Sequence, residues 1–378
     1  MLELRGKYNT ALVYTDSPDS STIGQIIALC NQEIFKDSKI RVMPDCHAGK
    51  GCVVGLTMDV KSAVCPYLVG VDIGCGMEAV KFKSKKGLDF NKLDKVIHEH
   101  IPSGFKIRKE IYNKPKLIKE IDFELTYITA NFDRKRALLS LGTLGGGNHF
   151  IEIARSDMDE GLWLIIHSGS RCLGVQVSDY HQKKAYEYCR EKKINVPFEL
   201  SYFEGELKDE YLSDLSITKD YAYYNRLIMS KIILDEMGWK EEARFPTFHN
   251  SIDSHYETGE RILRKGATTA YNLETILIPL NMKDGSLICH GKGNPEWNYS
   301  APHGAGRLYS RGESKERITL TEYKESMEGI YSSCISRGTI DESPMAYKNS
   351  GDIINAIGDT AEIVERLKPL YNFKAGGN

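Results

Sequence analysis

The sequence of 378 residues lacks several patterns that identify membrane, secreted and CxxC-containing proteins. No apolar run is long enough to cross a bilayer, and the start lacks the basic-then-apolar pattern of a signal region. The nine cysteines are odd in number and scattered, without a CxxC pair. We therefore expect a cytoplasmic protein with no membrane contact, whose thiols are reduced and free to bind metal.

A phosphate-binding loop of the form GxxxxGKS or GxxxxGKT is also missing, so any bound nucleotide must be held by another geometry. An excess of positive charge is missing too, because 50 Lys and Arg face 52 Asp and Glu. This balance argues against a protein that binds polyanions over its whole surface, but it is compatible with a local basic groove. The stretch from Lys106 to Lys119 fits either a track for nucleic-acid backbone or a plain exposed helical face.

No repeat, low-complexity tract or clear linker divides the chain, and 41% hydrophobic residues can build a large core. Helical spacing occurs in parts of 84–136, over most of 178–240 and in two stretches after 323. Apolar, β-branched segments bounded by Gly and Pro predict strands at 40–43, 52–55, 79–82, 163–166 and 276–278. The pattern predicts a single α+β domain over residues 1–378.

Side chains that bind transition metals stand in glycine-rich, non-helical blocks. Asp72 and Cys75 are three residues apart on a turn with glycine on both sides of Cys75, so both can face one ion. His149, His167 and His249 follow glycines or end apolar strands, where ligands often sit. Each alone is typical of a structural residue, but together they predict a shared metal site. The histidines at 98, 100, 181, 255 and 290 lack this context and are left out.

His303 stands between Pro302 and Gly304 and is followed by Arg307. An imidazole with one free nitrogen can attack phosphorus, and a nearby cation and arginine can neutralise the phosphate. The alternative is one more metal ligand. Phosphate or substrate contacts are further predicted, against the alternative of solvated surface groups, for Arg171, Arg307, the 264–267 segment and His47.

Taken in order, these blocks resemble the RtcB family of GTP-dependent RNA ligases. The resemblance covers roughly residues 40 to 374, and blocks of this length in this order are highly specific. The matching segments are Met43–Gly51, Gly70–Met77, Leu141–Phe150, His167–Arg171, His249–Asn250, Arg264–Ala267 and His303–Arg307. The chain departs from the family where Pro279–Lys283 replaces PGSMG and where Cys172 replaces a glycine, which indicates a divergent branch.

The resemblance implies β-sheets with peripheral helices around a central metal-binding cleft that holds two Mn²⁺ ions. Cys75 would bridge the ions, with Asp72 and His149 on one and His167 and His249 on the other. His303 would carry GMP as a covalent phosphoramidate. Lys374 would contact the guanine, and His47, Lys50 and Arg171 the RNA phosphates. The implied nucleotide site comprises Asn148, His149, Phe150, Ile151, Glu152, His249, Asn250, Pro279, Leu280, Asn281, Met282, Ser286, His303, Gly304, Ala305, Gly306, Arg307 and Lys374.

The function implied by the resemblance is the joining of RNA 3'-phosphate or 2',3'-cyclic phosphate ends to 5'-hydroxyl ends with GTP, in RNA repair or tRNA splicing. A metal-dependent cyclic phosphodiesterase and a metal-stabilised RNA-binding protein are the alternatives. His303 separates the three, because only the ligase needs a covalent guanylate. The ligand types alone would also suit zinc, cobalt or iron.

Overall fold

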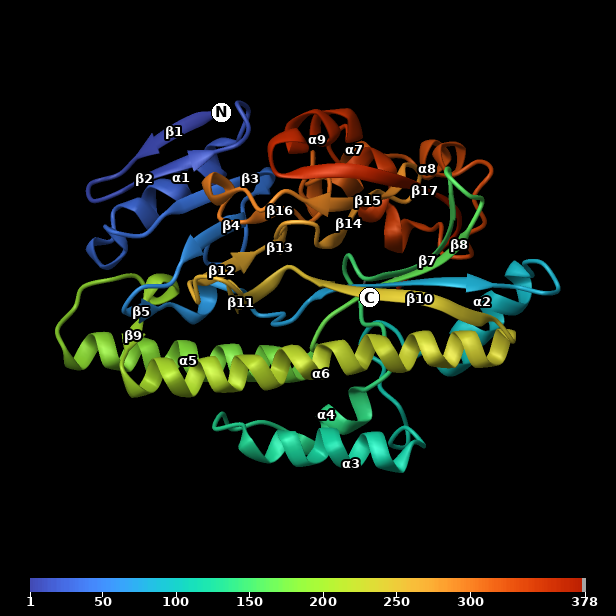
Figure 1. Cartoon of the computed structure of the whole chain (residues 1–378), viewed down its shortest axis with the longest axis horizontal. Helices are drawn as coiled ribbons and strands as arrows, with labels where there is room; N and C mark the ends of the chain where they lie inside the picture. Colours follow the sequence, from blue (N-terminus) through green and yellow to red (C-terminus); the bar gives the residue numbers. More distant parts are fainter. Residues whose placement is uncertain (376–378) are drawn as a thin grey trace.

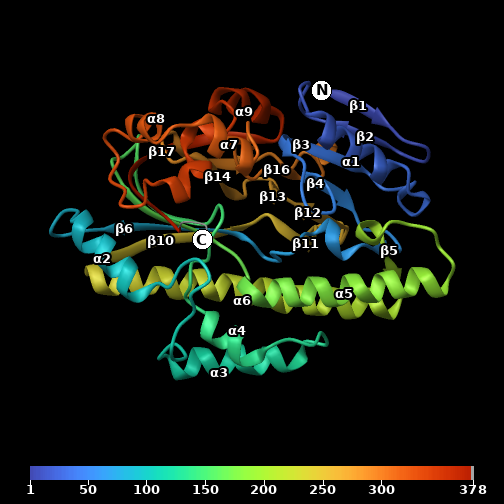
Figure 2. The same cartoon turned by 180° about the vertical axis from the view of Figure 1, so that it is seen from behind.

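The computed structural model describes residues 1–375, in which two β-sheets lie on one side of a pair of long helices (Figure 1). Two shorter helices lie on the other side of this pair, as the reverse view also shows (Figure 2). The long helices are α5 (Arg171–Glu191) and α6 (Glu206–Met237), and the shorter ones are α3 (Pro115–Glu124) and α4 (Arg134–Ser140). The α+β class expected from the sequence is confirmed.

The first sheet has six strands and is covered near the N-terminus by α1 (Ser20–Cys30). Its only parallel pair is β2 with β3. The predicted strand at 40–43 lies within it, whereas the one predicted at 52–55 begins later, at Val54. In spatial order the strands are β1 (Leu2–Arg5), β2 (Thr10–Val13), β3 (Ile40–His47), β4 (Val54–Asp59), β12 (Arg261–Lys265) and β11 (Asn250–Ser254).

The second sheet has seven strands, and every neighbouring pair in it is antiparallel. It contains the strands predicted at 79–82, 163–166 and 276–278, which are confirmed. In spatial order the strands are β10 (Lys240–Phe248), β6 (Gly76–Lys83), β8 (Leu162–Ser168), β7 (Phe150–Ser156), β17 (Ala361–Lys374), β15 (Gly285–Gly291) and β14 (Thr275–Asn281).

Both faces of this second sheet are buried. Because side chains alternate along a strand, Val80, Leu164 and Ile166 face the core that contains Met229 and Ile233 of α6. The alternate residues of the same strands, with others from β14, β15 and β17, form a separate apolar cluster on the opposite face. The curled sheet is thereby fixed against α6, and the ends of its central strands are held in place.

The remaining elements are short. The two helical stretches expected after 323 correspond to α8 (Leu320–Ser326) and α9 (Ser350–Ala356), whereas β17 was not anticipated. None of the helices in the described part of the chain combines the length and apolarity needed to span a bilayer. The other elements are α2 (Phe90–His100), α7 (Arg311–Arg317), β5 (Ala63–Val64), β9 (Phe203–Glu204), β13 (Ala267–Thr269) and β16 (Ser300–Pro302).

A buried hydrogen-bonded pair joins the two long helices. Nε2 of His181 on α5 lies 2.8 Å from Oδ2 of Asp214 on α6, and both side chains are fully buried. The carboxylate of Asp214 also accepts the backbone N–H groups of Thr129 and Ala130 at 2.8 and 2.9 Å. The pair therefore ties the segment that precedes α4 to both helices, so His181 has a structural role.

We expect Asp214→Ala to lower the free energy of unfolding by about 3 kcal/mol, because the imidazole and two amides would lose their buried partner. Chemical denaturation of wild type and variant measures the difference. Glu236→Ala, an exposed acidic position near the end of the same helix, is the matched control and should change stability little. Equal losses in the two variants would contradict the structural role of the pair.

Candidate metal centre and active site

Antiparallel pairing places the predicted metal ligands at one end of the second sheet. Cys75 immediately precedes β6, and its neighbour Gly76 pairs with Phe248 of β10, next to His249. His167, near the end of β8, pairs with Phe150 of β7, which follows His149. Strand register alone therefore brings together four segments that are far apart in the sequence.

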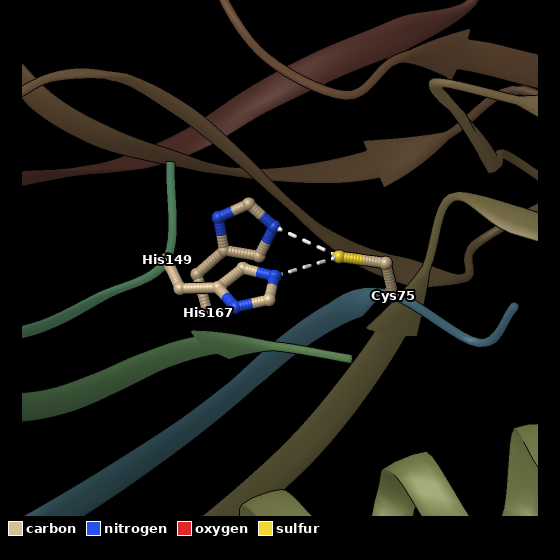
Figure 3. Close-up of side chains that lie close together, drawn as sticks. All are labelled: Cys75, His149 and His167. Carbon is tan, nitrogen blue, oxygen red and sulfur yellow. Dashed lines mark hydrogen bonds between the residues drawn. The ribbon is translucent and has the colours of Figure 1, made fainter. Parts of the chain in front are cut away.

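Three of the candidate ligand atoms, from Cys75, His149 and His167, lie within 4.8 Å of one another and could hold one metal ion. Sγ of Cys75 is 3.5 Å from Nε2 of His149 and 3.3 Å from Nε2 of His167, and both imidazoles point toward the sulfur (Figure 3). Nε2 of His149 is also 3.1 Å from Oδ2 of Asp72. Nε2 of His167 is 3.3 Å from Nε2 of His249. The structure thus brings together all five side chains that were expected to bind metal.

The far nitrogens of two imidazoles face backbone carbonyls. Nδ1 of His149 lies 2.9 Å from the oxygen of Leu144, and Nδ1 of His167 lies 3.2 Å from the oxygen of Asn148. Each Nδ1 therefore faces an acceptor, which orients the ring so that Nε2 is directed into the cluster. This arrangement orients both rings as metal ligands.

Burial sets the charge state of the cluster. It raises the pKa of the Cys75 thiol well above its usual value and lowers the pKa of His167 and of His249 well below theirs. Burial opposes ionisation of Asp72, but the hydrogen bond from His149 and the nearby charges lower its pKa. The neutral imidazoles of His167 and His249 thus face each other near the anionic carboxylate of Asp72, and a cation among these groups would deprotonate the thiol. A soft thiolate with several imidazoles suits a transition metal.

We expect Cys75→Ala to reduce the affinity for transition-metal ions by more than about 100-fold, because a central ligand is lost. Calorimetric titration with Mn²⁺ and metal analysis of the purified protein measure the loss. Cys334→Ala, which changes a half-buried cysteine remote from these ligands in the sequence, is the matched control. A Cys75→Ala protein that retains the metal content of the control would contradict the assignment.

A cavity of about 890 Å³ opens onto the metal cluster. It is bordered by most residues of the implied nucleotide site and by His47 and Lys50. Two predicted residues lie elsewhere: Ile151 is in the core, and Arg171 packs beside His149. Burial lowers the pKa of His47 to about 4, so this imidazole is neutral at physiological pH. The predicted residues on the cavity wall are Asn148, Phe150, Glu152, His249, Asn250, Pro279, Leu280, Asn281, Met282, Ser286, His303, Gly304, Ala305, Gly306, Arg307 and Lys374.

Within the 264–267 segment, Lys265 and Gly266 border the cavity, whereas Arg264 does not. Arg264 is fully buried and donates to the hydroxyl of Ser300 at 2.8 Å, so it is unavailable to a ligand. The ammonium of Lys265 donates to the carbonyl oxygens of Lys50 and Cys52 at 2.7 and 3.0 Å. Arg264 thus stabilises the structure away from the cavity, whereas Lys265 borders the cavity and stabilises its loops through these carbonyls.

His303 lies between the cavity and a buried carboxylate. Its Nδ1 is 2.8 Å from Oδ2 of Asp45, which is fully buried, and its ring centroid is 4.8 Å from that of His249. A carboxylate at Nδ1 favours the tautomer in which the lone pair is on Nε2. Asp45 lies within the Met43–Gly51 block, but the sequence alone assigns it no role because its pairing with position 303 is not local.

A second unexpected group is Glu342, at the end of a 3₁₀ helix (Arg337–Glu342). Its carboxylate is 2.7 Å from Lys374, 2.7 Å from Arg311 and 3.3 Å from Arg307. Burial opposes its ionisation, but the charges of Lys374 and Arg311 lower the pKa of Glu342 to about 2. This anion therefore holds three cations against one side of the cavity.

Comparison with known proteins agrees with this geometry. The sequence matches the family described as tRNA-splicing ligase RtcB over residues 27–126 and 116–375. It is 32% identical to the RNA-splicing ligase RtcB of Escherichia coli K12, with 90% of each chain covered. It is 28% identical to the tRNA-splicing ligase RtcB of Methanococcus maripaludis, with 87% of this chain and 86% of that one covered. The family match extends along nearly the whole chain. The buried thiol and imidazoles beside a cavity lined by cations agree with it, and the protein therefore belongs to the RtcB family.

Proposed function

We propose that this RNA ligase of the RtcB family joins RNA 3'-phosphate or 2',3'-cyclic phosphate ends to 5'-hydroxyl ends, with GTP as cosubstrate and two Mn²⁺ ions as the metal. The observation that carries the proposal is His303, whose Nδ1 lies 2.8 Å from the buried carboxylate of Asp45. An imidazole oriented in this way beside the ligand His249 is suited to nucleophilic attack.

In the proposed first step, Nε2 of His303 attacks the α-phosphorus of GTP. A nitrogen–phosphorus bond forms, the bond to the bridging oxygen breaks, and pyrophosphate leaves with the electron pair. The carboxylate of Asp45 stabilises the positive charge that develops on the imidazole, as a buried aspartate does in a catalytic triad. The metal, when bound, supplies positive charge that neutralises crowded phosphates and lowers the pKa of an attacking hydroxyl.

The guanylate then passes to the RNA 3'-phosphate, and the nitrogen–phosphorus bond breaks. The 5'-hydroxyl of the second RNA end attacks the activated phosphate, and GMP leaves. A cyclic phosphate is first opened to a 3'-phosphate by water. The capping step is needed because a bare 3'-phosphate has no good leaving group, and a bound cation with arginine or lysine groups would stabilise the charge in each transfer.

The cavity offers groups for recognising a purine base. Glu152 borders it, and burial raises the pKa of this carboxyl to about 8. One oxygen of Glu152 accepts from Asn372 at 2.9 Å, and the other has no hydrogen-bond partner among the described residues. Lys374 borders the same cavity from the end of β17. We infer that these two side chains hydrogen-bond to guanine, while His47, Lys50 and Arg171 contact RNA phosphates.

We expect His303→Ala to abolish formation of a labelled protein band when the protein is incubated with labelled GTP and Mn²⁺ and run on a denaturing gel. In the wild type the bond should be labile in acid and stable in base, as phosphoramidates are. The variant should fail to join 3'-phosphate to 5'-hydroxyl ends. It should still slowly join RNA that already carries guanylate on its 3'-phosphate, because the metal ligands are intact.

His290→Ala, a histidine outside the cavity wall, is the control for His303→Ala. A wild-type protein that opens cyclic phosphates but never acquires GMP, with Mn²⁺ or other divalent ions, would overturn the ligase proposal. That result would instead favour a cyclic phosphodiesterase.

We expect Lys374→Ala to raise the GTP concentration needed for half-maximal guanylate formation by about tenfold, because a charge-assisted contact to the base is lost. Metal binding should not change, since Lys374 contacts Glu342 rather than the metal ligands. Guanylate formation is measured across a range of GTP concentrations, with Lys368→Ala on the same strand as control. An unchanged GTP dependence would remove Lys374 from the nucleotide site.

A further inference from the structure

The structure also contains an aromatic side chain with no place in the nucleotide site. Phe105 is 83% exposed, the largest value among the large hydrophobic residues described. Isolated exposed apolar residues are common on protein surfaces, so exposure alone implies nothing. Its position relative to the Gly145–Gly147 loop, which leads to His149 of the metal cluster, is what distinguishes it.

Phe105 stands at the apex of a turn that is fixed to this loop. The N–H of Lys106 donates to the oxygen of Ser103 at 3.2 Å and closes the turn. The N–H of Gly104 donates to the oxygen of Gly145 at 2.9 Å. The exposed ring is thus carried on a backbone whose conformation is already set, so little entropy would be lost when a ligand contacts it.

The glycine loop forms a continuous surface between this turn and the mouth of the cavity. At one end, Gly146 lies against Gly104, since a side chain at position 146 would come within 3.6 Å of the Cα of Gly104. At the other end, Gly147 lies near Arg311, which borders the cavity. Gly146 and Gly147 are partly exposed and carry no side chain, so a ligand backbone can approach them closely, whereas Gly145 is buried against Arg171.

Positive charge accompanies this surface. Nη1 of Arg171 lies 3.3 Å from Nδ1 of His149, and Nη2 lies 3.5 Å from the oxygen of Gly104, so its guanidinium sits beneath the loop. Lys106 is exposed next to Phe105. Half of the Arg311 side chain is accessible at the cavity mouth. A smooth track with cations along it and an exposed aromatic ring at its end matches the way proteins bind single-stranded nucleic acid.

We propose that Phe105 is a stacking platform for a base of the substrate RNA, whose backbone crosses the Gly145–Gly147 loop on its way to the metal cluster. This inference rests on the proposed ligase function and adds a residue that positions the RNA. Phe105 does not border the cavity, so it has no part in the reaction with GTP.

Phe105→Ala tests the proposal in steady-state joining of RNA ends. We expect KM for RNA to rise by about tenfold, the loss typical of one base–aromatic stack. The rate of enzyme–guanylate formation from GTP alone should stay at the wild-type value, and Phe105→Trp should restore KM. Phe123→Ala, a 62% exposed phenylalanine on α3, is the matched control and should leave KM unchanged. An unchanged KM in Phe105→Ala would overturn the proposal.

A second experiment identifies stacking rather than a general effect on the fold. RNA substrates with one abasic nucleotide, scanned through the positions on each side of the junction, should include one that raises the wild-type KM as much as Phe105→Ala does. That substrate should cause no further increase with Phe105→Ala, because the same contact is already missing. Additive losses at every position would contradict stacking.

The binding of labelled single-stranded RNA to the wild type and to Phe105→Ala separates this inference from the ligase proposal. If the wild type forms no guanylate and joins no ends, the proposed function fails. A weaker affinity of the variant for RNA would then still support Phe105 as an RNA contact. Equal affinities would reject it.

Discussion

The geometry of the candidate metal cluster depends on the hydrogen bonds that the guanidinium of Arg226 donates. It extends from α6, is fully buried, and donates to the carbonyl oxygens of Gly74 at 2.9 Å and Ser168 at 2.7 Å. It also lies 5.0 Å from the ring centroid of Phe248. These three residues are each adjacent in sequence to a metal ligand, so one cation on the long helix fixes the backbone of three ligand-bearing segments. Both hydrogen bonds come from Nη1, while Nε and Nη2 have no partner among the described residues, so the loss of either carbonyl would leave the buried charge still less satisfied.

Strand register supplies the second constraint. Met77 pairs with His167 on β8, and His167 in turn pairs with Phe150 on β7. A shift of one residue would turn the imidazole of His167 to the other face of the sheet, away from Cys75. Packing on both faces opposes such a shift, because it would exchange side chains of different shape, such as Trp163 and Leu164, between the two buried clusters. The same packing that stabilises the sheet therefore determines the distances within the metal cluster.

The candidate metal ligands could be singled out from the sequence because their signals are local. Cys75 has glycine on both sides and lies three residues after Asp72, and such patterns are visible within a short window. Asp45 and Glu342 could not be assigned in this way, because each acquires its role through a partner far away in the chain. The strand β17 and the burial of Arg264 could not be predicted for the same reason, since both depend on partners far away in the chain. A basic residue in a glycine-rich block looks like a phosphate ligand until the tertiary structure places Ser300 against it.

Arg171 connects the two sides of the glycine loop. It is the first residue of α5, and its φ of 55° lies in the left-handed region that residues other than glycine rarely adopt. Such strain persists only where the surroundings impose it, and it is concentrated at functional sites. Here the guanidinium occupies space that a side chain at position 145 would fill, and it lies close to both His149 and Gly104. The strained backbone thus holds one cation between His149 and the turn that carries Phe105.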